Sequence, residues 1–399
     1  MLTAALAVAP IALSQQPWPT AGWSRATAAS VGLDPAVLAA LDQDLAKGKY
    51  SLVDSFQVFR CGAMVYDRRY EHDYAKLYWK EAHTRSPLNA RLTGPYNYFD
   101  PLWHPYYHGT DMHTMQSVTK SVSSAILGIA ITRGDFKDSL DTPIYRYFDV
   151  TKLKYLDDRK RRITLKHVLT MSTGLEWHEM DVDYDDPRSD SSRMEATDDW
   201  VQYVIDRPMA ADPGKRFNYS SGDAELLAYI FKKGTGQDIE AYGERHLFAP
   251  LGIRHYWKRT YLGVVDTEGG LYLSGQDLAK IGYLYLNDGV WDGKRLMSAE
   301  WIRQSLTPAF DTGWQGLKYG YKWWLQPRKD GGELIWHAIG LGGQRLMVFS
   351  SEQLIATFTA WDVLQDPAFD VELADRLLPA VRRSAPCLSA HPARSRSAH

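Results

Sequence analysis

Strand-like segments stand at both ends of this chain and helical segments fill the middle, an order that few folds accommodate. Residues 55–70 alternate apolar and polar side chains around Cys61-Gly62, the pattern of a two-stranded hairpin. Two short apolar runs, residues 344–350 and 354–361, indicate a second hairpin. Helical segments between them cover residues 117–133, 165–171, 200–206, 223–233 and 239–246. We therefore expect an α/β (α+β) fold in which an antiparallel sheet is flanked by helices and carries an inserted all-helical domain.

This order also predicts the boundaries of the parts. The sheet should come from about residues 30–110 and 264–380, the two regions that carry the strand patterns. One further helix is expected over residues 274–287. The helical insertion should occupy about residues 125–263.

The two ends of the chain differ from the rest in composition. Residues 1–13 (MLTAALAVAPIAL) form a short apolar run like that of a secretory leader, although the usual preceding Lys or Arg is missing. We expect a leader over residues 1–29 and a periplasmic or secreted protein, with the cytoplasm as the alternative. Residues 381–399 are rich in Ser, Ala, Arg and Pro without apolar periodicity, which predicts a disordered tail.

Composition excludes several classes of protein. With 45% apolar and 24% charged residues among 399, the chain is neither intrinsically disordered nor collagen-like. Its net charge of -2 offers no bulk attraction to phosphate backbones, so we expect no nucleic-acid partner. No run approaches the roughly 18 uncharged residues of a membrane helix. The two cysteines, Cys61 and Cys387, allow one disulfide but do not require it. The oligomeric state stays open.

The clearest chemical motif is an S-x-x-K, Ser117-Val118-Thr119-Lys120, at the start of a predicted helix. Positions three apart lie on one face of a helix, so the Lys120 amine can reach the Ser117 hydroxyl. Partial burial favours the neutral amine, which can accept the serine proton. The helix N-terminus adds free N–H groups near a developing oxyanion. Taken alone, the motif also fits a serine helix cap followed by a surface lysine.

Two further segments suit such a site. Tyr219 and Ser221 lie on a loop after Pro213-Gly214, and a phenol near an ammonium can relay a proton. Residues 340–344 (GLGGQ) lead into an apolar strand, and glycines let a carbonyl group approach the N–H groups of a strand edge. This segment is not a nucleotide-binding loop, because no helix follows it and no G-x-x-x-x-G-K motif is present.

In this order the three motifs resemble the serine β-lactamase and penicillin-binding superfamily, specifically its class C-related esterases and amidases. Residues 163–175 (ITLKHVLTMSTGL) are similar to the segment after the family's active-site helix. Residues 213–219 (PGKRFNY) and 270–289 (GLYLSGQDLAKIGYLYLNDG) are similar to its approach to the Tyr motif and its second-half helix. The resemblance covers residues 30–380 and is closest to the family VIII-type carboxylesterase and 6-aminohexanoate-dimer hydrolase branch.

The resemblance implies a role for each motif residue. Ser117 would be the acylated nucleophile, Lys120 its general base and Tyr219 the proton relay to the leaving group. Ser221 stands where many relatives carry Asn, and its hydroxyl would support Lys120. No metal or other cofactor is implied, and which of Lys120 and Tyr219 is the base at each step stays open. Backbone N–H groups of Ser117 and of the glycine-rich segment would form the oxyanion hole, with Leu341, Gly342 and Gly343 as candidates.

Departures from the family pattern shape the substrate expectation. β-Lactamases and D,D-peptidases carry a Lys-Thr/Ser-Gly strand whose cation helps to bind a substrate carboxylate. Here residues 340–342 read Gly-Leu-Gly, with no cation before Arg345. One lost charged hydrogen bond costs about 1.5–3 kcal/mol, or tenfold and more in binding. No E-x-x-L-N motif is present, so a class A-type deacylating glutamate is not expected. We expect hydrolysis of small carboxylic esters or amides; the alternatives are a D,D-peptidase or β-lactamase, and a non-catalytic binding protein on the same scaffold.

Aromatic residues make up 13% of the chain, and several of them surround the S-x-x-K motif. Residues 92–108 form a proline-broken, aromatic-rich loop just before Ser117. We therefore expect Tyr98 and Trp103 from this loop, together with Trp177, to contact the substrate.

Two clusters of polar residues could suggest a metal. His104, His108 and His113 have helix-like spacing, but Pro105 places them on a loop without acidic or thiol ligands nearby. The alternating aspartates of residues 181–185 lack the Gly and Glu that a calcium loop needs at its later positions. We expect no metal site, and a solvated acidic loop at residues 181–185.

Overall fold

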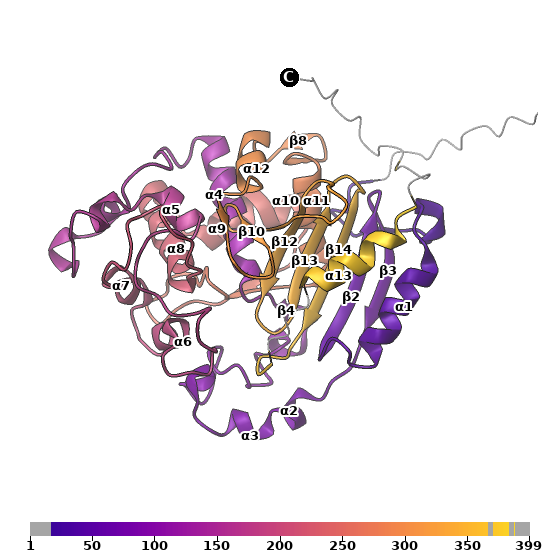
Figure 1. Cartoon of the computed structure of the whole chain (residues 1–399), viewed down its shortest axis with the longest axis horizontal. Coiled ribbons are helices and arrows are strands. Elements are labelled where there is room, and N and C mark those ends of the chain that lie inside the picture. Colours follow the sequence, from indigo (N-terminus) through magenta and orange to yellow (C-terminus); the bar gives the residue numbers. More distant parts are fainter. Residues whose placement is uncertain (1–16, 366–369, 383–386, 388–399) are drawn as a thin grey trace, which may run out of the picture.

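A nine-stranded sheet forms the centre of the protein (Figure 1), whose computed structural model describes residues 17–365, 370–382 and 387. The strand order is β1-β3-β2-β14-β13-β12-β11-β10-β9. The strands are β1 Ser24–Arg25, β2 Val53–Arg60, β3 Ala63–Arg69, β9 Phe310–Asp311, β10 Lys318–Tyr319, β11 Trp324–Gln326, β12 Ile335–Gly340, β13 Gln344–Phe349 and β14 Leu354–Ala360.

The two predicted hairpins are confirmed and lie side by side. Cys61 and Gly62 adopt positive φ angles of 54° and 77° between β2 and β3, the left-handed conformation that tight turns require. β2 pairs antiparallel with β14, so that Arg60 lies opposite Leu354 and Ser55 opposite Thr359. This pairing joins the N-terminal and C-terminal parts of the chain in one sheet, as the sequence predicted.

Two features of the sheet differ from the prediction. The sheet is mixed, because the two-residue strand β1 runs parallel to β3 at the edge. A second, three-stranded sheet is formed by β4 (His113–Thr114), β6 (Leu271–Leu273) and β5 (Tyr256–Trp257). Such short strands have too few residues to show an alternating pattern.

Helices cover both faces of the large sheet (Figure 1). One face carries α1 and α13, which contact each other, and the opposite face carries α11 and α4. None of the helices in the described ranges is long and apolar enough to cross a membrane. The helices are α1 Pro35–Ala46, α2 Tyr74–Leu77, α3 Trp79–Ala82, α4 Val118–Arg133, α5 Leu165–Leu169, α6 Asp190–Glu195, α7 Trp200–Ile205, α8 Ser221–Thr235, α9 Ile239–Gly243, α10 Ala249–Leu251, α11 Gly275–Leu286, α12 Ala299–Ser305 and α13 Asp370–Leu377.

Helix α4 is the central helix of the protein. Its residues 118–130 are all buried, because the helix contacts β12 and β13 on one side and α8 and α9 on another. It ends at Gly134, whose φ of 75° gives the left-handed C-terminal cap. α5 and α7 pack on α8 beyond α4. The apolar core between the sheet and these helices therefore holds the start of α4 in a fixed place.

The packed body begins before residue 30. Residues 1–16 of the predicted leader lie outside the described residues, but Trp23 is buried and its Nε1 donates to the Gln276 carbonyl at 3.0 Å. At the other end Val381 forms a β-bridge with Leu33. Apart from residues 381, 382 and 387, the predicted tail lies outside the described residues.

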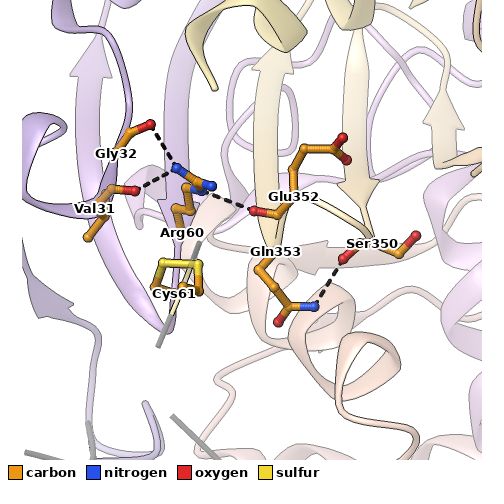
Figure 2. The surroundings of a disulfide bond; sticks show 8 residues. Val31, Gly32, Arg60, Cys61, Ser350, Glu352 and Gln353 are labelled. Atoms are coloured by element: carbon orange, nitrogen blue, oxygen red, sulfur yellow. Dashed lines mark hydrogen bonds between the residues drawn. A yellow bond between two sulfur atoms is a disulfide. The ribbon is translucent and has the colours of Figure 1, made fainter. Parts of the chain in front are cut away.

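A disulfide joins Cys61, in the β2–β3 turn, to Cys387 (Figure 2). The adjacent Arg60 ties three segments together. Its Nη1 donates to the carbonyls of Val31 and Gly32 at 2.6 and 2.8 Å, and its Nε donates to the Glu352 carbonyl at 3.0 Å. This end of the sheet is therefore fixed both covalently and by a buried guanidinium.

Candidate active site

The S-x-x-K motif stands at the N-terminus of α4. Ser117 is the N-cap residue and remains partly exposed, whereas the helix behind it is buried. Gln116, just before it, has a φ of 47°, an unfavourable conformation for a residue that is not glycine. Backbone strain of this kind is concentrated at functional sites, and here it turns the chain sharply so that Ser117 faces a cavity.

Lys120 is brought against Ser117 as the helical spacing predicted. Its Nζ lies 2.7 Å from Ser117 Oγ, 3.1 Å from Ser221 Oγ and 2.7 Å from the carbonyl oxygen of Glu268. The residue is only 1% exposed. These three partners hold the buried amine in one position. One of them, the Ser117 hydroxyl, is the group that Lys120 would deprotonate.

The Tyr219-Ser220-Ser221 segment approaches Lys120 from the start of α8. The ring centroid of Tyr219 lies 5.2 Å from Lys120 Nζ, and the ring packs against Trp324. Ser220 caps α8 by accepting from the Asp223 N–H, which leaves Ser221 to bond Lys120. The structure therefore brings together the serine, the lysine, the tyrosine and the second serine that the sequence singled out.

The glycine-rich segment is the turn between β12 and β13, two interior strands of the large sheet. A Cβ on Gly340 would come within 2.4 Å of the Met115 carbonyl, so only glycine fits where β12 meets the segment before Ser117. Within the described ranges the N–H groups of Ser117 and Leu341 donate to no protein acceptor. Both N–H groups are therefore available to a substrate oxyanion.

Leu341 contacts the cavity, but the two glycines that follow it serve the turn. Gly342 and Gly343 have φ angles of 78° and 109°, which favour glycine. The Gly343 N–H donates to the Gly340 carbonyl at 3.3 Å, and the Gly342 carbonyl accepts from the Asp362 N–H at 3.1 Å. Only the first residue of the predicted trio, Leu341, lines the cavity.

Buried acids lie behind Lys120. The Glu268 carboxylate lies 3.6 Å from Lys120 Nζ. Burial by itself would raise the pKa of Glu268, but the charge of Lys120 and a hydrogen bond from Glu195 lower it overall. Burial and the nearby Glu268 charge raise the pKa of Glu195 well above its ordinary value. Glu195 is therefore the protonated partner, and the Glu268 anion faces the lysine.

A cavity of about 550 Å³ opens in front of Ser117. One wall is acidic and comes from the loop that the sequence predicted to be solvated, through Glu179, Asp183 and Asp185. Another part of the lining is apolar and consists of Trp314, Trp324, Ile339, Leu341 and Val363. The site can therefore hold an uncharged acyl group against aromatic side chains while a more polar group faces the acidic loop.

The three predicted substrate contacts are elsewhere. Tyr98 is buried, stacks on Trp361 and donates to Glu195 at 2.6 Å, so its ring is part of the core. Trp103 packs edge-on against His108. Trp177 is buried and supports the acidic loop through its Nε1. None of the three is among the residues that line the cavity.

Sequence reasoning missed several residues of the site. Glu179 accepts from Ser221, and Glu268 accepts from Lys120, yet each is far from its partner in the sequence. Trp324 lies on β11 and Trp314 in the loop between β9 and β10, both far from Ser117 in the sequence. Among these residues, only Glu268 could have been identified from the sequence, since it lies two positions before the 270–289 segment that resembles the family.

The histidines of the 104–113 region have structural partners. His104 Nε2 lies 3.0 Å from the Pro95 carbonyl, and His113 Nε2 lies 3.0 Å from Asp54 Oδ2. Across the described ranges no three His, Cys, Asp or Glu side chains are grouped so that they could hold a metal ion.

Comparison with known proteins agrees with this geometry. The family described as Beta-lactamase matches residues 55–377, most of the chain. The chain belongs to the Beta-lactamase family. It is 24% identical over 273 residues to the 6-aminohexanoate-dimer hydrolase of Paenarthrobacter ureafaciens, which covers 63% of this chain and 67% of that relative.

Solved structures of other proteins share the fold. EstCE1, described as a hydrolase with promiscuous acyltransferase activity, superposes with a TM-score of 0.61 at 12% identity, covering 86% of this chain and 97% of that one. The octameric penicillin-binding protein homologue from Pyrococcus abyssi gives 0.57 at 18% identity, covering 85% and 76%. The mixed sheet flanked by helices is therefore the β-lactamase-like fold, and the comparisons support a hydrolase of the serine β-lactamase-like superfamily.

Proposed function

We propose that this protein is a serine hydrolase that forms an acyl-enzyme on Ser117 and hydrolyses small carboxylic esters or amides. The observation that carries the proposal is the 2.7 Å contact between Lys120 Nζ and Ser117 Oγ at the wall of the cavity. In its unprotonated form Lys120 accepts the Ser117 proton while Oγ attacks the substrate carbonyl. The N–H groups of Ser117 and Leu341 stabilise the oxyanion, and Tyr219 passes a proton to the leaving group.

The apolar part of the cavity lining supports esters or amides as substrates over β-lactams. Arg345 lines the cavity, but its Nη1 donates to the carbonyls of Gly340 and Gln344, at 2.8 Å each. These two hydrogen bonds hold the turn together. The apolar wall instead suits an acyl group without a carboxylate.

Replacement of the nucleophile tests the proposal. Ser117→Ala should abolish turnover of p-nitrophenyl esters while the circular dichroism spectrum and the unfolding midpoint stay unchanged. In the wild-type protein, intact-mass measurement after exposure to an ester should find one acyl group on Ser117. Unchanged turnover in Ser117→Ala would refute the proposal, and nitrocefin turnover as fast as ester turnover would favour the β-lactamase alternative.

A further inference from the structure

Lys120 needs a route by which it can lose a proton. At 1% exposure it has no direct contact with solvent, and its hydrogen-bond partners are Ser117 Oγ, Ser221 Oγ and the Glu268 carbonyl oxygen. A backbone carbonyl does not carry a proton onward. Once Ser117 is acylated, its Oγ has no proton and no longer connects Lys120 to the cavity. The Glu268 carboxylate also lies 3.6 Å from Nζ, but it is buried and does not line the cavity, so Ser221 is the contact that still leads outward in the acyl-enzyme.

Ser221 connects Lys120 to a carboxylate. Its Oγ lies 3.1 Å from Lys120 Nζ and 2.7 Å from Glu179 Oε1. A hydroxyl can accept a hydrogen bond from an ammonium and at the same time donate its own proton to a carboxylate. An amide, which many relatives carry here by resemblance, can bridge the same two groups but does not exchange its protons in this way. The hydroxyl at position 221 is thus the feature that makes transfer feasible.

Glu179 is fixed with one oxygen toward Ser221. Its Oε2 accepts from Trp177 Nε1 and from the Ser221 N–H at 2.7 Å each, and its Oε1 also accepts from the Tyr184 hydroxyl at 2.8 Å. Together with the Ser221 hydroxyl, these donors hold the carboxylate in one orientation. Glu179 also lines the cavity that contains Ser117, so water in this cavity can reach it.

From these contacts we infer that Ser221 and Glu179 form a proton relay between Lys120 and the cavity. This inference rests on the proposed function. An N–H bond of the Lys120 ammonium breaks as that proton binds Ser221 Oγ, while the O–H bond of Ser221 breaks and its proton binds Glu179 Oε1. Lys120 becomes neutral and Glu179 becomes a neutral acid. The acid then releases the proton to water in the cavity, which restores the starting carboxylate. Tyr219, which gave its own proton to the leaving group, takes one back from the same water. The relay readies Lys120 to activate the deacylating water.

The test compares variants of the relay during turnover of p-nitrophenyl acetate. Glu179→Gln keeps the size of the side chain but cannot take up a proton, and Ser221→Ala removes the bridging hydroxyl. We expect each to lower kcat by about 100-fold, the scale of general acid–base effects, with KM little changed. Intact-mass measurement at steady state should show more acylated Ser117 than in the wild type. Because the two residues act in series, the double variant should be no slower than the slower single variant.

Two controls separate the relay from a purely structural role of Glu179. Trp177→Phe removes a hydrogen bond to the same carboxylate but leaves Oε1 facing Ser221, so kcat should change by less than about fivefold, the worth of one hydrogen bond. Sodium formate should restore turnover to Glu179→Ala in a concentration-dependent manner, because a small acid can occupy the space of the lost carboxylate.

The outcomes test the relay separately from the proposed function. If Glu179→Gln and Ser221→Ala keep kcat near the wild-type value, the relay is refuted, and acylation of Ser117 in the same samples would leave the proposed function intact. If Glu179→Gln does not fold, the result for Ser221→Ala decides. If wild-type Ser117 is never acylated, the proposed function fails before the relay is reached.

Discussion

Two adjacent serines at the start of α8, Ser220 and Ser221, have the same side chain but different roles. Ser220 Oγ accepts from the Asp223 N–H at 2.9 Å and so caps the helix. Ser221 Oγ instead faces Lys120 and Glu179. The backbone of Ser220 is extended, with a φ of −145°, and this turns the two neighbours in different directions.

This difference gives a matched pair of variants. Ser220→Ala should lower the free energy of unfolding by about 1 kcal/mol, the usual cost of losing an N-cap, and leave kcat nearly unchanged. Ser221→Ala should instead lower kcat and leave the free energy of unfolding nearly unchanged. Urea unfolding and ester turnover measured on both variants check this. A loss of kcat in Ser220→Ala equal to that in Ser221→Ala would contradict the division of tasks.

A buried histidine makes stability depend on pH. His337 on β12 is fully buried beside Gln326, and burial, together with the charge of Arg345, lowers its pKa to about 3. The unfolded chain binds this proton near pH 6.5 and the folded chain does not. The contribution of neutral His337 is therefore complete above pH about 6.5 and is lost as the pH falls toward 3, by about 1.4 kcal/mol per pH unit.

His337→Asn should weaken this dependence, because the amide does not titrate. We expect the free energy of urea unfolding to fall less steeply between pH 6.5 and 4.5 in His337→Asn than in the wild type, even if the variant is less stable at pH 7. His104, whose pKa is lowered by burial and by Lys258, should keep part of the slope. Equal slopes in both proteins would show that His337 is protonated in the folded state.

At the scale of elements, the position of α4 depends on close contact with α12. A Cβ on Gly128 would come within 2.3 Å of the Trp301 ring, which is 3% exposed and has no free space to move into. Alanine is a better helix former than glycine by about 1 kcal/mol, whereas overpacking a core costs about 1–3 kcal/mol. The packing effect should therefore outweigh the helix propensity.

Gly128→Ala should thus lower the free energy of unfolding by up to about 2 kcal/mol. The added methyl group should also displace α4 and so lower kcat, because Ser117 stands at the start of this helix. Chemical denaturation with a double-mutant cycle checks the cause. In a Trp301→Leu background the same substitution should be neutral or stabilising. If the two substitutions are additive, Trp301 is not the obstacle.

At the scale of the whole molecule, the disulfide joins residues that are 326 positions apart. It ties the C-terminal segment to the β2–β3 turn, next to the hydrogen bonds of Arg60 (Figure 2). A cross-link over so long a loop restricts the unfolded chain strongly. Structural disulfides persist in oxidising compartments, which supports our proposal that the protein functions in the periplasm or outside the cell.

Removal of the bridge should affect stability and not catalysis. Replacement of both cysteines by serine should lower the free energy of unfolding by about 2–4 kcal/mol, and reductant should do the same to the wild type. Since neither cysteine lines the cavity, kcat/KM should remain at the wild-type value. Two titratable thiols in the native, oxidised protein would contradict the bridge.

Local patterns in the sequence determined much of this protein. The alternation around Cys61-Gly62 predicted the β2–β3 hairpin, and the three-residue spacing of Ser117 and Lys120 placed both on one helix face. These predictions succeeded because hairpins and helical faces depend on residues only a few positions apart. The order of strand regions at the two ends and helices between them likewise followed from such local patterns, although the short strand β5 lies within the region predicted to be helical.

Tertiary structure alone decided the surroundings of the site. Glu179 lies 42 positions from Ser221, and the Glu268 carbonyl lies 148 positions from Lys120, so no local pattern marks either contact. Tyr98 was assigned to the substrate pocket but is buried against Trp361, because an aromatic ring suits a core and a pocket equally well. Sequence therefore specified which groups can do chemistry, and the packing of distant segments decided which of them meet, since burial and charge depend on neighbours that only the fold brings together.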